Sequence, residues 1–187
     1  MFFVYTIGSA GKKNDVLQDS HLILAIQNFD MNTGLVHLHN LLRWIILILL
    51  ILSIVKSYTG WKQKKVFSQG DRKTWLFTMI AAHITLVLGL YQWLAGRYGM
   101  LTTTLPEGTS MMKDKFYRFF WMEHPLTMIL AIVMITLGYG VAKKAMPDET
   151  KYRKAFWFFV IALLLIFIGM PWPFRELIGR PWFPGMG

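Results

Sequence analysis

The 187-residue chain contains no cysteine. This absence excludes disulfides, thiol catalysis, iron–sulfur clusters held by cysteine and the covalent attachment of a c-type haem. Charged residues are also scarce, at 16% of the chain, whereas a soluble domain typically carries about 25%. Hydrophobic residues make up 55%. Because a chain of this length cannot bury that much apolar surface in a core of its own, the composition predicts an integral membrane protein.

Four hydrophobic segments follow one another, at about residues 35–55, 74–96, 124–142 and 155–174. Each is close to the ~20 residues that a helix needs to cross the bilayer core, and strand-like alternation of hydrophobicity is absent. The sequence therefore predicts an all-α fold, a bundle of four transmembrane helices. We divide the chain into an N-terminal extension of unclear status (1–30), the four-helix transmembrane domain (31–175) and a Pro/Trp-rich C-terminal tail (176–187).

The formal net charge of +10 is concentrated in two places. Eleven of the twenty Lys and Arg residues flank or lie in the connections after the first and third segments: Lys56, Lys62, Lys64, Lys65, Arg72, Lys73, Lys143, Lys144, Lys151, Arg153 and Lys154. The positive-inside rule then predicts short basic cytoplasmic loops, with both termini outside the cell (inner) membrane. This placement explains the charge without nucleic acid, which we exclude as a partner.

Ionisable residues inside a membrane are costly and usually functional. The hydrophobic segments and their edges contain six: His37, His39, Arg43, His83, Glu123 and His124. Counted from the basic ends at ~1.5 Å per residue, His39 and His124 lie at a similar depth, roughly 25–28 Å up, and His83 lies roughly 10 Å lower. We therefore expect His39 and His124 to approach each other near the outer surface, in one polar cluster with Arg43 and Glu123.

Two histidines at one level on different helices can hold a flat macrocycle such as haem. Thr127, Ala131 and Gly138 form a face of small residues below His124, which would leave room for a porphyrin edge or would simply allow close helix packing. Arg43 lies one helical turn below His39. Its guanidinium would pair with a haem propionate, with Glu123 or with a lipid phosphate.

Other interpretations of these residues stay open. A zinc or copper site could use His37, His39, Glu123 and His124, although no metal-binding spacing such as HExxH is present and His37 could join His39 only in an extended chain. The polar residues could also serve only to pair with one another. Nucleophile–base arrangements, Walker loops and GxGxxG motifs are not visible in the sequence, so hydrolase and nucleotide-binding functions have no support.

Several motifs resemble those of small four-helix membrane proteins labelled cytochrome b-like, over roughly residues 31–187. The resemblance is carried by HLHNLLRW at His37–Trp44, by the mid-helix His83, by FFWMEHPLTM at Phe119–Met128 and by PWPFR at Pro171–Arg175. It implies a b-type haem and membrane electron transfer. Diheme cytochromes of this kind use histidine pairs at two levels, whereas here the fourth segment has no histidine and His83 has no partner at its depth.

The expectation is therefore one haem b near the outer face. Its axial ligands would be His39 and His124, with His83 as the substitute if the helices are offset, and Arg43 would neutralise a propionate. Such a protein would pass electrons between a quinol and a partner protein in a respiratory-type chain, with quinone and other membrane-complex subunits as partners. Two alternatives are a non-catalytic accessory subunit or assembly factor without cofactor, and a small metal-handling or transport protein.

Overall fold

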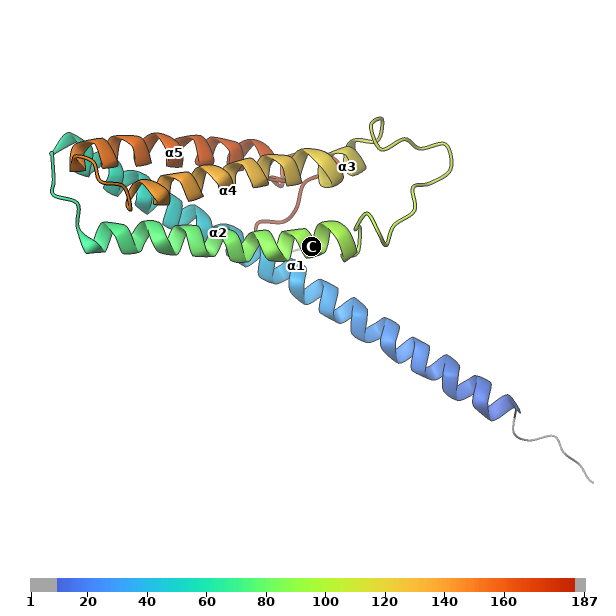
Figure 1. Cartoon of the computed structure of the whole chain (residues 1–187). Helices are drawn as coiled ribbons and strands as arrows, with labels where there is room; N and C mark the ends of the chain where they lie inside the picture. Colours follow the sequence, from blue (N-terminus) through green and yellow to red (C-terminus); the bar gives the residue numbers. More distant parts are fainter. Residues whose placement is uncertain (1–9, 184–187) are drawn as a thin grey trace, which may run out of the picture.

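The computed structural model describes the backbone of residues 10–183 and the side chains of residues 31–183. Its elements are α1 (Ala10–Lys62), α2 (Gln69–Ala95), α3 (Lys115–Arg118), the π-helical turn η1 (Phe119–Glu123), α4 (His124–Val141) and α5 (Asp148–Gly169) (Figure 1). No strand occurs in this part of the chain. Four helices are long and apolar enough to cross a membrane: Met31–Lys62, Gln69–Ala95, Lys115–Val141 and Asp148–Gly169. The prediction of an all-α bundle of four candidate transmembrane helices is confirmed.

The four long helices form a square in cross-section. α1 packs against α2 and α5, and α4 packs against the same two helices, so that α1 and α4 occupy diagonal corners. Residues on α1 and α4 can therefore meet only across the axis of the bundle. Many large apolar side chains on the outside are exposed, as a lipid-facing surface requires.

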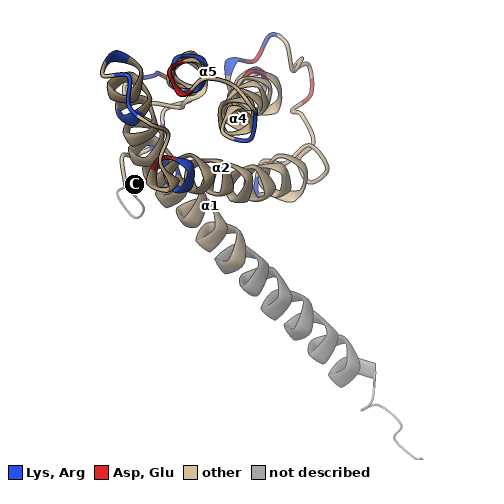
Figure 2. Cartoon of the chain, turned by 60° about the vertical axis from the view of Figure 1, so that its left-hand side comes forward, with Lys and Arg blue, Asp and Glu red and all other residues tan. Residues whose placement is uncertain are grey.

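Both basic connections, 63–68 and 142–147, lie at one end of this bundle, which we call the basic end. The backbone N–H of Phe67 donates to Asp148 across 3.0 Å, and the Tyr152 hydroxyl donates to Asp71 across 2.6 Å. Ser68 caps α2 by accepting a hydrogen bond from the N–H of Asp71, which satisfies an otherwise unpaired helix donor. Figure 2 shows Lys and Arg at the ends and connections of the helices, with the helix middles largely free of charge.

Two helix ends differ from the sequence-based boundaries. α1 continues past Val55 to Lys62, because long basic side chains can extend their charge to the interface while their stems cover apolar surface. α5 ends at Gly169, before the expected Phe174. Pro171 forces this end, because the residue before a proline is pushed out of the helical region, and Met170 is indeed extended (φ −80°, ψ 136°).

The third span begins earlier than expected and contains a π-helical turn. Its helix starts at Lys115 and passes through η1 before His124. Pro125 lacks an N–H and cannot bond to the carbonyl of Trp121 four residues back. The indole N–H of Trp93 on α2 donates to this carbonyl instead, at 2.9 Å. π-Turns are rare and occur frequently at functional sites, and this one immediately precedes His124.

The half of the bundle towards the basic end is closely packed. Ser53 and Thr78 are fully buried and hydrogen-bonded to each other at 2.8 Å. Gly138 lies against Phe159 of α5, and a Cβ placed on Gly138 would come 2.5 Å from the Phe159 ring. The small-residue face of α4 thus packs against α5. At Gly138 its small size allows close helix packing, and the space is filled by Phe159 rather than left for a porphyrin edge.

We predict that Gly138→Ala destabilises the bundle by about 1–3 kcal/mol, the usual cost of overpacking a core. Gly140→Ala is the matched control on the same helix, because a Cβ at Gly140 meets nothing within 4 Å. Thermal unfolding of the purified proteins in detergent measures the difference. Equal unfolding temperatures for the two variants would contradict the close packing of α4 on α5.

The charge distribution predicts that the basic end faces the cytoplasm. Because the chain has no cysteine, Gln63→Cys at the basic end and Ser110→Cys in the connection 96–114 each provide a unique label site. We expect an impermeant maleimide applied to intact cells to label Ser110→Cys and to leave Gln63→Cys unlabelled until the membrane is permeabilised. The reverse pattern would invert the topology.

Candidate functional site

His39 of α1 and His124 of α4 meet across the bundle axis. Their ring centroids are 6.4 Å apart, and the ring planes are inclined by 69°. They come from diagonal helices, so this contact closes the interior of the bundle at its far end, opposite the basic end. The predicted approach of the two histidines is confirmed.

The protonation of His124 is fixed by the backbone of α5. Its Nδ1 lies 2.7 Å from the carbonyl oxygen of Gly169. Because a carbonyl oxygen only accepts hydrogen bonds, Nδ1 carries the proton, and in the neutral ring Nε2 keeps its lone pair. Histidine ligands of metals are oriented by this kind of hydrogen bond.

His39 has the complementary feature, a buried nitrogen without a partner. Its Nδ1 is inaccessible and forms no hydrogen bond with any residue that the structure describes. An unpaired polar atom of this kind costs free energy in an apolar interior. Gly89 of α2 lies beside this ring, where an added Cβ would come 3.3 Å from Cε1 of His39. α2 thus lies so close to His39 that even a Cβ at residue 89 would require a small shift of the ring.

The ring separation suits a metal ion shared by the two histidines. A histidine nitrogen binds a metal ion such as zinc at about 2 Å. An ion shared by two histidines therefore places the two imidazole centres about 6 Å apart. The observed 6.4 Å agrees with that distance. The donor set of two neutral nitrogens also suits haem iron, for which histidine is a common axial ligand.

Arg43 lies one helical turn from His39 and binds the C-terminal tail. Its Nη2 donates to the carbonyl oxygens of Pro181 (3.2 Å) and Trp182 (2.8 Å). The indole N–H of Trp44 donates to the same Trp182 carbonyl at 2.9 Å, and the two indoles stack. The tail therefore crosses from the end of α5 to α1 (Figure 1). Nε of Arg43 is buried without a hydrogen-bond partner among the described residues.

Glu123, one of the three partners considered for Arg43, does not form an ion pair with it. Glu123 pairs instead with Arg118, one turn earlier on the same helical span, at 2.8 Å. Arg43 has no carboxylate partner within residues 31–183. The reason is geometric: Arg118 precedes Glu123 by five residues through the π-turn η1, which places the two on one face.

The zinc or copper site with His37 and Glu123 as further ligands is not assembled among the described residues. Residues 37–39 are helical, and residues two apart on a helix point to different faces, so His37 does not join His39. Within the described part of the chain, no three His, Asp or Glu side chains come together in a group that could hold a metal ion.

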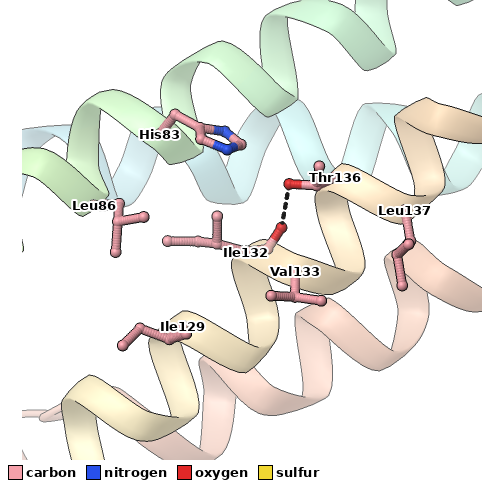
Figure 3. A pocket seen from close by; sticks show the side chains of 7 residues that line it. All are labelled: His83, Leu86, Ile129, Ile132, Val133, Thr136 and Leu137. Atoms are coloured by element: carbon pink, nitrogen blue, oxygen red, sulfur yellow. Dashed lines mark hydrogen bonds between the residues drawn. The ribbon is translucent and has the colours of Figure 1, made fainter.

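His83 lies apart from the His39–His124 pair. It is six residues from Gly89 along α2, roughly 9 Å nearer the basic end. Its ring is exposed at the surface of the bundle, and Nδ1 lies 2.8 Å from the Met79 carbonyl. His83 lines a groove between α2 and α4 (Figure 3). The groove has a volume of about 280 Å³.

Sequence reasoning missed three parts of this site. The tail carbonyls that bind Arg43, the Gly169 carbonyl that orients His124 and the close approach of Gly89 all involve backbone atoms or a missing side chain. The only signal in the sequence was the Pro/Trp-rich composition of the C-terminal tail. Known protein families, curated protein sequences and solved structures contain no match to this chain.

Proposed function

We propose that this chain is an integral membrane b-type haem protein of the cell (inner) membrane, passing electrons between a quinol and a partner protein of a respiratory-type chain. The observation that carries the proposal is the 6.4 Å separation of the His39 and His124 rings across the bundle axis. His39 and His124 would hold the haem iron. A haem held in this way supplies reversible one-electron transfer.

The chain's own groups support that role. The Gly169 carbonyl holds His124 in the tautomer that leaves Nε2 free to act as a ligand. The unpaired Nδ1 of His39 and Nε of Arg43 are buried at the same end of the bundle. Arg43 has no carboxylate to neutralise it among the described residues, so its positive charge is available to a propionate.

We predict that His39→Ala and His124→Ala each lower the haem content of the purified protein by at least about tenfold. Loss of a residue that merely orients a metal ligand costs 10–100-fold in affinity, and loss of the ligand itself costs no less. His83→Ala is the matched control, because His83 lies roughly 9 Å away along the membrane normal. Reduced-minus-oxidised absorbance, normalised to protein, measures all three variants and the wild type.

The wild type, expressed with ample haem, should show a Soret band and a sharp reduced α-band. If wild-type preparations lack Soret absorbance, the proposal is wrong, and a non-catalytic accessory subunit or assembly factor becomes the better description. If His83→Ala removes the spectrum while His39→Ala retains it, the haem is present but its ligand is misassigned.

Gly89 provides a second prediction, one that leaves both histidines in place. Gly89→Leu should lower haem content severalfold, because a side chain there would crowd the His39 ring. Gly140→Leu, at a position with open space around it, should leave haem content unchanged. Equal haem content in the two variants would show that haem binding does not depend on the absence of a side chain at Gly89. Circular dichroism confirms that both variants remain helical.

A further inference from the structure

His83 is an exposed polar side chain near the middle of a transmembrane helix, and the His39–His124 pair does not use it. Its Nδ1 is close enough to the Met79 carbonyl to donate a hydrogen bond, at 2.8 Å. In the neutral ring this fixes Nε2 as a lone-pair acceptor. No hydrogen bond joins Nε2 to any residue that the structure describes. A polar atom in this position costs free energy in hydrocarbon unless a ligand satisfies it.

The surroundings of Nε2 are otherwise apolar. The groove is lined by His83 and Leu86 from α2 and by residues of α4 that include Ile129, Val133, Thr136 and Leu137 (Figure 3). Thr136 is the second polar residue of the lining, and its hydroxyl donates to the carbonyl of Ile132 in its own helix at 2.7 Å. The lining therefore offers an acceptor to a ligand and no free donor.

From this arrangement we infer that the groove binds the reduced head group of an isoprenoid quinone, with a quinol hydroxyl donating to Nε2 of His83. The volume of about 280 Å³ lies near the lower limit for small-molecule sites, which start at about 300 Å³. A quinol dissolves in the membrane at this depth and carries hydroxyl donors, whereas an oxidised quinone has only acceptors. The site should therefore prefer the reduced form.

Two other occupants fit the chemistry less well. A lipid acyl chain fills an apolar groove but has no donor for Nε2. In a symmetric dimer formed through this face, the groove would meet a copy of itself, and that copy has no free donor either, because the Thr136 hydroxyl is already used. Of these three occupants, only the quinol supplies a donor for Nε2 of His83.

The physiological meaning of this inference rests on the proposed function, but quinol binding in the groove can be tested whether or not the protein binds haem. The probe is a short-chain benzoquinone with a diazirine on its tail, used oxidised or reduced with borohydride. The full chain is placed in phosphatidylcholine nanodiscs and photolysed, and mass spectrometry then locates the labelled residues. Haem content is measured on the same samples.

We expect labels on α2 and α4 around the groove, with the reduced probe labelling about three- to tenfold more efficiently, the effect of one hydrogen bond. His83→Phe should abolish that redox preference while retaining the shape of the lining. Val133→Trp should block both forms of the probe by filling the groove. Val87→Trp, on the same stretch of α2 but outside the lining, should block neither.

Equal labelling by the two forms in the wild type would overturn the inference and identify the groove as an acyl-chain site. Labels located away from the groove would also overturn it, as would blockage of the groove by a second copy, seen as dimers in the nanodiscs. The two proposals fail separately. If the protein contains haem but the labelling does not depend on the redox state of the probe, only the quinol site is ruled out. If the redox-dependent labelling occurs in a protein without haem, only the electron-transfer function is ruled out.

Discussion

The hydrocarbon core of a bilayer contains no water, so every polar group in this bundle needs a partner within the protein or on a ligand. The half near the basic end meets this demand internally with one exception, the buried indole N–H of Trp75, which has no partner among the described residues. Asp71 accepts hydrogen bonds from Tyr152 and Ser68 and pairs with Lys56 at 3.1 Å, and Ser53 and Thr78 satisfy each other. These groups hold the connections and the helices together, and they leave no lone pair directed at a ligand.

The far half does not meet the same demand. Asn32, His39, Asn40 and Arg43 each have a buried side-chain atom without a partner among the described residues. All four lie on the α1 face of the region that contains the His39–His124 contact. Unpaired buried polar atoms are rare in folded proteins, and four of the five such atoms among the described residues lie on α1 near the His39–His124 contact.

The architecture that creates this region consists of local departures from regular helix. Pro171 ends α5 at Gly169 and frees the carbonyl that binds His124. η1 and Pro125 interrupt the regular hydrogen bonding at the start of α4. The indole N–H of Trp93 on α2 donates to the Trp121 carbonyl that this leaves unpaired. Gly89 removes a side chain beside His39. Each departure is a single residue or turn, and together they shape the end of the bundle at which His39 and His124 meet.

The sequence predicted the parts of this structure that depend on periodicity and depth. Four spans, the basic end and the level shared by His39 and His124 follow from hydropathy and from the rise per residue of a helix. The pairing of Arg43 could not be predicted, because its partners are backbone carbonyls of a tail that folds back over α1. Glu123, one of the three partners considered for Arg43, pairs with Arg118 instead, which the π-turn places on the same face.

The central claim is that His39 and His124 together bind one iron. Electron paramagnetic resonance of the oxidised, purified protein tests it most directly, because two axial histidines make ferric haem low-spin. The account predicts a low-spin ferric signal that integrates to one iron per chain and that changes to high-spin, or disappears, in His124→Ala. A wild-type protein that contains haem but gives only a high-spin signal would contradict the joint ligation of iron by these two residues.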